Sequence, residues 1–205
     1  MAKQLTRREQ VRQETIEKIL SIAREEMQAN GVAALSLGVI AKRLGMRTPS
    51  LYTYFDSKND IYDELFRRGF LEFGRRMDER PNQNGTLREN LESALRSYLR
   101  FAQENQDLYQ LMFQRPVPGF VPSEESMAVS LARLDSIRGQ FMQILEREEI
   151  TLDIPYEEAR DLYIAFQHGL TELHLANNPE LPVGQGRFGK LIPQAVQMVV
   201  DAWKK

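Results

Sequence analysis

Arginine, hydroxyl and lysine side chains gather between positions 47 and 58, and their types suit contact with nucleic acid. Arg47 can pair with guanine through two hydrogen bonds, while Ser50 and Thr53 can contact several bases or a thymine methyl group. The hydroxyls of Tyr52 and Tyr54 suit phosphate oxygens, which orient a protein on DNA without specifying sequence. Packing against a neighbouring helix is the alternative for these two rings. The residue types therefore indicate a DNA-reading surface, provided that one short helix presents them together.

The stretch SLGVIAKRLGMRTPSLYTYFDSK, which begins at Ser36, reads as two short helices joined by a turn. Ser36 can cap the first helix, whose apolar face is formed at helical spacing by Leu37, Ile40, Ala41 and Leu44. Gly45 stands where a chain leaving a helix needs a left-handed residue. Thr48 as cap and Pro49 as the first helical residue open a second helix, which we expect to reach Phe55. The stretch predicts a helix-turn-helix, whose second helix can enter a major groove.

The next helix start places a cation where the positive end of the helix dipole disfavours it. Ser57 and Asp60 form a capping-box pattern, and Lys58 lies between them at the first helical position. A phosphate group at this point would meet both the helix amides and the lysine.

The first predicted helix begins with the same kind of signal. Thr6 and Glu9 form a capping-box pattern, and the helix extends to Asn30. Arg7, Arg8 and Arg12 lie in its first turns. A solvated charged face and a phosphate or minor-groove contact both remain open for these three arginines, and the neighbouring helix-turn-helix favours the contact.

The order and spacing of these residues resemble the N-terminal DNA-binding domain of the TetR (tetracycline-repressor) family of transcription regulators. The likeness extends from Thr6 to Phe66, and its shared positions run Gly31…Ser36…Ile40-Ala41…Gly45-Met46…Pro49-Ser50-Leu51-Tyr52…Tyr54-Phe55…Ser57-Lys58. The sequence departs from the family pattern at two positions, since the family commonly has serine where Arg47 stands and often histidine where Tyr54 stands. The resemblance and the residue types together predict DNA contacts from Arg7, Arg8, Ser36, Arg47, Thr48, Pro49, Ser50, Tyr52, Thr53, Tyr54 and Lys58.

The bulk composition is that of an ordinary globular protein. Its 205 residues carry a net charge of −2, with 27% charged and 42% apolar residues and no cysteine. The first 60 residues have a net charge of +3 and the remainder of −5, which fits a mildly basic DNA-reading module on an acidic body. No apolar run approaches the length of a membrane span, and the N-terminus has no apolar signal region, so we expect a cytoplasmic protein without membrane contact.

The remaining patterns predict an all-α protein of about nine helices. We expect a loose arm at residues 1–5, a helix-turn-helix DNA-binding domain at residues 1–66, and a helical domain for effector binding and dimerisation at residues 67–205. Breaks in the helical pattern fall at residues 80–85 and at the proline-rich residues 116–122.

The last two predicted helices are strongly amphipathic. One covers residues 156–176, and the other has apolar residues at helical spacing, namely Phe188, Leu191, Ile192, Ala195, Val196, Val199, Val200 and Trp203. Pro193 predicts that the regular helix starts only one or two residues before it. Periodicity favours core packing for these two helices. The TetR resemblance implies that they form a homodimer through a four-helix contact between subunits.

The predicted body is rich in aromatic and methionine side chains, which serve as plain core or line an apolar pocket between helices. A pocket is typical of the family, so the resemblance implies a small, largely apolar effector bound by Tyr109, Met112, Phe113, Met127, Phe141, Phe166 and His168. The stretch Gln167-His168-Gly169 also resembles a Trp-His-Gly stretch in the ligand-binding domain of one TetR branch. A core or interface histidine is the alternative for His168.

Catalytic and metal-binding patterns are missing from the sequence. The two histidines have no suitable ligand pattern around them, and we find no nucleophile elbow, P-loop or dinucleotide motif. We therefore expect no enzyme activity, cofactor or metal. The TetR resemblance implies a homodimeric repressor that binds a palindromic operator and is released by its effector. A sequence-tolerant architectural DNA-binding protein and a helical enzyme with an incidental helix-turn-helix are the alternatives.

Overall fold

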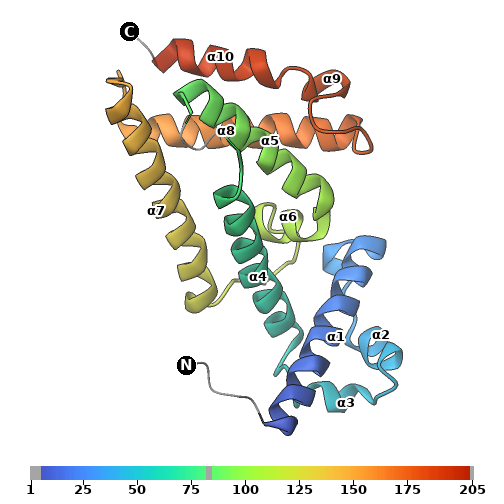
Figure 1. The fold of residues 1–205 in the computed structure, drawn as a ribbon. Coiled ribbons are helices and arrows are strands. Elements are labelled where there is room, and N and C mark those ends of the chain that lie inside the picture. Colours follow the sequence, from blue (N-terminus) through green and yellow to red (C-terminus); the bar gives the residue numbers. More distant parts are fainter. Residues whose placement is uncertain (1–5, 82–84, 204–205) are drawn as a thin grey trace. The chain divides into compact units, whose positions relative to one another are not determined.

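The computed structural model describes residues 6–81 and 85–203, which form ten α-helices, one 3-10 turn at Val32–Ala34 and no β-strand (Figure 1). The all-α prediction is thereby confirmed. The arm expected at residues 1–5, and residues 82–84 of the expected break, lie outside the described residues. The helices are α1 (Arg7–Asn30), α2 (Leu37–Arg43), α3 (Thr48–Leu51), α4 (Lys58–Asp78), α5 (Leu87–Glu104), α6 (Gln106–Phe113), α7 (Glu124–Arg147), α8 (Tyr156–Asn177), α9 (Gly186–Gly189) and α10 (Ile192–Trp203).

The described residues contain one helix more than the nine expected, because the final amphipathic run is divided. The four-residue α9 ends at Gly189, and α10 begins at Ile192, one residue before Pro193. A proline fits the first turn of a helix, where its missing N–H group would have no partner, and it disfavours helix in the residues before it. The start predicted from Pro193 is confirmed.

Local capping signals explain where three of the long helices begin. Thr6 and Glu9 form a complete capping box at α1, and Thr86 and Glu89 form one at α5. At α4 the Ser57 amide donates to an Asp60 carboxylate oxygen at 2.9 Å, and the Asp60 amide donates to the Ser57 hydroxyl at 3.3 Å. Each box satisfies amide groups that a helix start otherwise leaves without partners.

The chain divides into two compact units, each formed by two separate segments. The first unit contains Met1–Phe70 and Gln106–Val129, and the second contains Leu71–Asn105 and Ser130–Lys205. The helix α6 belongs to the first unit because Asp107, whose side chain is fully buried, receives a 2.7 Å hydrogen bond from the Arg24 guanidinium of α1. A buried carboxylate requires such a partner, so this pair fixes α6 on α1.

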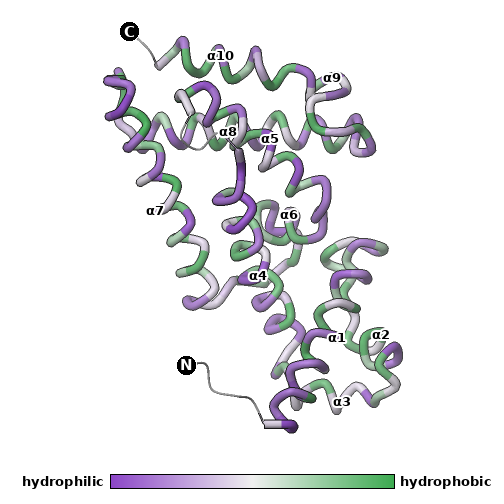
Figure 2. Tube along the Cα trace, in the orientation of Figure 1, coloured by the Kyte–Doolittle hydropathy of each residue, from purple (hydrophilic) through white to green (hydrophobic). Residues whose placement is uncertain are grey.

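The second unit has its own apolar core. The buried face of α5, with Leu87, Leu91, Leu95 and Leu99, packs with residues of α7, α8 and α10. Hydrophobic and hydrophilic positions alternate along α10, as an amphipathic helix on a core requires (Figure 2). None of the helices described is long and apolar enough to span a membrane.

Candidate nucleic-acid interface

A left-handed glycine makes the turn between α2 and α3. Gly45 has a φ angle of +67°, its amide donates to the Lys42 carbonyl at 3.2 Å, and the Met46 amide donates to the Ala41 carbonyl at 3.0 Å. A Cβ atom at Gly45 would meet no heavy atom within 4 Å, so backbone conformation rather than space disfavours other residues here. The turn predicted at Gly45 is confirmed.

Replacing Gly45 with alanine is expected to lower the free energy of unfolding by about 1–2 kcal/mol, the cost of holding an L-residue in the left-handed region. Urea denaturation followed by circular dichroism measures the change. Gly139→Ala is the matched control, because Gly139 lies within α7 with equally open space around it. There alanine should stabilise the helix by up to about 1 kcal/mol. Equal effects of the two substitutions would contradict the role assigned to Gly45.

The first helix of the motif and the start of α3 differ in detail from the prediction. Ser36 occupies the cap position of α2, but its hydroxyl forms no capping bond. Arg47, not Thr48, is the cap residue of α3, so Thr48 is the first helical residue and Pro49 the second. Because a guanidinium has no acceptor atom, α3 starts without a side-chain cap, while Pro49 fixes its own φ angle and needs no N–H partner.

The second helix is also shorter than predicted, since α3 ends at Leu51 rather than at Phe55. The chain continues in tight turns: the Thr53 amide donates to Ser50 at 3.3 Å and the Tyr54 amide donates to Leu51 at 2.9 Å. Bonds of this i to i+3 type are common where a helix ends. The turns carry Tyr52, Thr53 and Tyr54 onward from the helix.

One side of α3 is buried and the opposite side is exposed. Leu51 is 1% exposed, and it shares the core of the first unit with the fully buried Ile40 of α2. Arg47, Pro49, Ser50 and Thr53 are exposed, and half of the Tyr52 surface is accessible. Thr48, Tyr54, Ser36 and Lys58 are half-buried, and Arg7 and Arg8 are exposed at the start of α1. The burial of Leu51 thus fixes which side chains α3 presents to solvent.

Internal bonds narrow what some of these side chains can do. The Thr53 hydroxyl donates to the Ser50 carbonyl at 2.8 Å, so its oxygen can accept a hydrogen bond but its proton is committed. The Arg12 guanidinium donates to the Thr53 carbonyl at 3.3 Å and lies 5.8 Å from the centre of the Tyr54 ring. Arg12 therefore holds the residues that follow α3, a positioning role that no pattern in the sequence indicated.

Lys58 lies at the start of α4, as its position in the capping box predicted. Its ammonium nitrogen is 5.7 Å from the centre of the Tyr62 ring. The Tyr62 side chain is fully buried, and its hydroxyl donates to the Val32 carbonyl at 2.7 Å. The ring is thus a fixed support for the lysine, and a cation on such a face gains a modest attraction. The helix dipole and the lysine together favour an anion at this helix start.

Cations of the first unit differ in whether they form ion pairs. Arg24, Arg43, Arg67 and Arg68 form ion pairs with acidic side chains. Arg7, Arg8, Arg47 and Lys58 form no ion pair with any residue that the structure describes. These four cations lie at the cap position of α3 and at the starts of α1 and α4, where a phosphate backbone could neutralise them.

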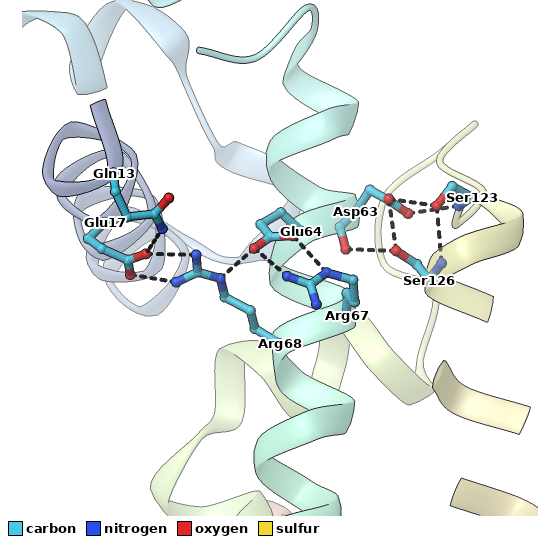
Figure 3. A network of polar contacts seen from close by, with 8 residues as sticks. All are labelled: Gln13, Glu17, Asp63, Glu64, Arg67, Arg68, Ser123 and Ser126. Carbon is cyan, nitrogen blue, oxygen red and sulfur yellow. Dashed lines mark hydrogen bonds and ion pairs between the residues drawn. The ribbon is translucent and has the colours of Figure 1, made fainter. Parts of the chain in front are cut away.

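A polar network ties α4 to its neighbours in the first unit (Figure 3). Arg68 of α4 pairs with Glu17 of α1 at 2.5 Å and with Glu64 of its own helix at 2.6 Å. On the other side, Asp63 accepts from the amide of Ser123 at 2.7 Å and from the hydroxyl of Ser126 at 2.8 Å (Figure 3). Asp63 thereby satisfies donors at the start of α7, and the network fixes the helix that begins at Lys58.

The residues predicted to line a ligand pocket are dispersed. Tyr109, Met112 and Phe113 of α6, and Met127 of α7, all belong to the first unit, where the Tyr109 and Phe113 rings pack 5.4 Å apart. In the second unit Phe166 is packed partly buried against the apolar core. The Tyr98 hydroxyl lies 3.1 Å from the ring nitrogens of His168, and burial lowers the pKa of that histidine.

A cavity of about 70 Å³ lies within the second unit. Helices α4, α5, α7, α8 and α10 contribute its walls, and Phe141 is the residue of the predicted set that lines it. The Trp203 ring packs edge-on against Phe141 with centroids 5.4 Å apart, and it lies 6.3 Å from Tyr163. Arg80 and Arg133 also line the cavity, and the sequence had suggested neither.

Part of the chain that includes α2 and α3 is similar in sequence to known proteins. Residues 19–65 match the family described as bacterial regulatory proteins, tetR family. The transcriptional regulator Rv1816 of Mycobacterium tuberculosis, described as of the helix-turn-helix type, is 24% identical over 127 residues, which cover 60% of this chain and 54% of that protein. The match thus spans about half the length of this relative.

Solved structures share the fold over nearly the whole chain. A regulatory protein of the tetR family from Rhodococcus RHA1 is 15% identical, with a TM-score of 0.67 over 93% of this chain and 97% of that one. The transcriptional regulator FadR from Bacillus subtilis, solved in complex with stearoyl-CoA, is 18% identical, with a TM-score of 0.67 over 91% and 98% of the two chains.

The helices α2 and α3 and the turn at Gly45 form a helix-turn-helix within an all-α fold. Residues 19–65 thus match the tetR family of bacterial regulatory proteins, and the chain shares its fold with a solved protein of that family. The resemblance found in the sequence is therefore confirmed. The named relatives are transcription regulators rather than enzymes.

Proposed function

We propose that the protein regulates transcription by placing α3 in the major groove of double-stranded DNA. The observation that carries the proposal is the exposure pattern at α3. Leu51 is buried, while Arg47, Ser50 and Thr53, in or next to this helix, are exposed to solvent. Arg47 would read guanine, and Ser50 and Thr53 would accept hydrogen bonds or contact a thymine methyl group. Tyr52, Lys58 and the start of α1 would hold phosphates on either side of the groove.

The protein would act as a homodimer on a palindromic operator, since each subunit carries one such helix. Apolar side chains on the surfaces of α8 and α10 support this arrangement. On α8 exposed small or apolar residues recur at intervals of three and four, namely Leu162, Ala165, Gly169, Leu173 and Ala176. In and just before α10 the exposed apolar residues are Leu191, Met198 and Ala202. Two copies of each helix would bury these surfaces in a four-helix contact.

An effector bound in the second unit would control the interaction with DNA. The cavity there has Phe73 and Met77 of α4 in its wall, and the same helix begins at Lys58. A small, largely apolar ligand against these residues could favour a conformation in which the two heads no longer fit the operator. The extent of release is limited by how differently the ligand binds the two conformations. The FadR relative with stearoyl-CoA is consistent with a ligand-responsive repressor of this fold.

Footprinting of the purified protein on the DNA that flanks its own gene, at near-physiological salt, tests the proposal. A protected palindrome would support a sequence-specific regulator. Protection without boundaries would favour an architectural DNA-binding protein and would contradict the operator proposal. If no DNA is protected, and Lys58→Ala leaves weak binding to random DNA unchanged, the alternative of an incidental helix-turn-helix is favoured.

Replacing Lys58 with alanine is expected to weaken binding to specific and random DNA by the same factor. The reason is that a phosphate contact carries no sequence information, so one fewer counterion is released on every DNA. The slope of log K against log salt should become shallower by about one unit. Filter binding at four salt concentrations measures both effects, and Lys190→Ala, an exposed lysine of the second unit, is the control. A changed operator preference would contradict the phosphate assignment.

A further inference from the structure

Both apolar side chains and arginines line the cavity of the second unit, and two of the arginines, Arg133 and Arg160, pair with Asp78 and Asp161. Phe141 and Trp203 form part of the apolar wall. The residues that line the cavity, all of them within the described chain, include three arginines, Arg80, Arg133 and Arg160, and no carboxylate. An entirely apolar effector would match the aromatic lining but not the arginines.

Arg133 presents hydrogen-bond donors that nothing described in the protein uses. The residue is 8% exposed, and Nη1 alone is paired, at 2.7 Å, with Asp78. The Nε and Nη2 atoms are buried and have no partner among the described residues. Asp78 is 56% exposed, so its charge is largely compensated by water. A buried guanidinium edge without an acceptor is costly, and its persistence indicates that an acceptor binds there.

A second buried guanidinium, that of Arg80, also lines the cavity. Arg80 is buried and donates to the side-chain oxygens of Asn90 at 3.1 Å and Gln140 at 3.2 Å, both of them neutral groups. Burial, and then the neighbouring charge of Arg133, lower the pKa of Arg80. Two like charges thus share the site, and an anion bound between the helices would relieve their repulsion.

The Tyr156 hydroxyl supplies a further donor at the cavity. It is buried and has no hydrogen-bond partner within the described part of the chain. The Tyr156 ring lies 5.6 Å from Phe141 between centroids, so the donor and the aromatic wall are adjacent. The unsatisfied groups of Arg133 and Tyr156 can all donate, and only a ligand with acceptor atoms would satisfy them.

We propose that the cavity binds a small organic carboxylate, with its anionic head on the Nε and Nη2 edge of Arg133 and its apolar body against Phe141 and Trp203. A guanidinium edge and a carboxylate pair through two parallel hydrogen bonds. The volume of about 70 Å³ exceeds several-fold the roughly 10–15 Å³ that one water needs, but it is about half of the roughly 150 Å³ cavity known to hold benzene. The body must therefore be compact, which excludes a long acyl chain.

A role for this carboxylate as effector rests on the proposed function. Its binding to the cavity can be tested without DNA. Trp203 is the single tryptophan of the chain and lines the cavity. We would titrate the full-length protein with butanoate, and with the uncharged analogue butanamide, while recording tryptophan emission. Butanoate should give a saturable change, and butanamide should bind at least about tenfold more weakly, because it loses the charge-assisted pair.

Variants distinguish a ligand-binding role for Arg133 from a structural one. Arg133→Gln should abolish the butanoate response, whereas Arg88→Gln, the same charge change at an exposed position of α5, should retain it. Without ligand, Arg133→Gln should melt at the same temperature as the wild type or higher, because a poorly satisfied buried cation is removed. The proposal is overturned if butanamide binds as well as butanoate, if decanoate binds more tightly than butanoate, or if Arg133→Gln keeps the response. A lowered melting temperature in Arg133→Gln would overturn it in favour of a structural role.

The effect of the carboxylate on DNA binding is measured in a separate experiment. If butanoate binds through Arg133 but does not change the affinity for DNA, the anion site stands and the effector role in the proposed function fails. If the protein protects an operator and Trp203 responds to no carboxylate, the DNA-binding proposal stands and the anion site fails.

Discussion

Replacing Leu162 with glutamate is expected to convert a dimeric protein to monomers and to reduce operator affinity by about 10²-fold or more. Leu162 is 60% exposed in the apolar row of α8, which we propose to meet its symmetry mate across a two-fold axis. Glutamate would place a charge from each subunit in a contact that excludes water, where like charges repel and neither is paired. A single head would then bind a half-site alone and lose the avidity of two linked heads.

Analytical ultracentrifugation gives the mass of the Leu162→Glu variant, and gel shifts on a full operator and on one half-site give its affinity. Leu131→Glu is the matched control, since Leu131 of α7 is 56% exposed and lies outside the apolar rows of α8 and α10. The control should remain dimeric. A dimeric Leu162→Glu protein with unchanged operator affinity would rule out the proposed subunit contact.

Replacing Arg47 with alanine is expected to weaken operator binding by about 1–3 kcal/mol and to relax the preference for one guanine in each half-site. Arg47 is exposed at the start of α3, and no described acidic residue pairs with it, so its guanidinium is available to a base. The loss should be smaller on random DNA, where a base contact makes no specific contribution.

Arg47→Lys separates charge from geometry at the same position. Lysine keeps the positive charge but lacks the rigid fork that forms two hydrogen bonds with guanine. Binding of both variants to operators that carry each base at the contacted position measures the preference. We expect Arg47→Lys to lose most of the preference while keeping the salt dependence of the wild type. Equal losses on all sequences would mean that Arg47 contacts phosphate and that another residue reads the base.

The sequence predicted best the features that depend on near neighbours. The capping boxes at Thr6 and Ser57 need residues only three positions apart, and Gly45 needs only its own backbone conformation. Such signals survive in any tertiary context. The start of α3 was predicted one residue too late. Thr48 was preferred to Arg47 as the cap residue because threonine is a common helix cap and arginine is not.

Features that depend on contacts between distant residues could not be predicted. Arg12 holds the carbonyl of Thr53, 41 residues away, and Arg24 pairs with Asp107, 83 residues away. The second pair places α6 in the first unit, which no local pattern indicates. The burial of Arg133 beside the cavity could not be predicted either, because it follows only from the packing of five helices.

Selection of binding sites from a pool of random double-stranded DNA tests most directly whether paired α3 helices read a palindrome. DNA that binds the purified protein at near-physiological salt is recovered and amplified over several rounds. The same selection is carried out with the Arg47→Ala variant. We predict an inverted repeat for the wild type, with half-sites centred about one helical turn or slightly more apart, and loss of one conserved guanine per half-site for the variant. Retention of DNA without any enriched sequence, or of a lone half-site by a dimeric protein, would contradict the account.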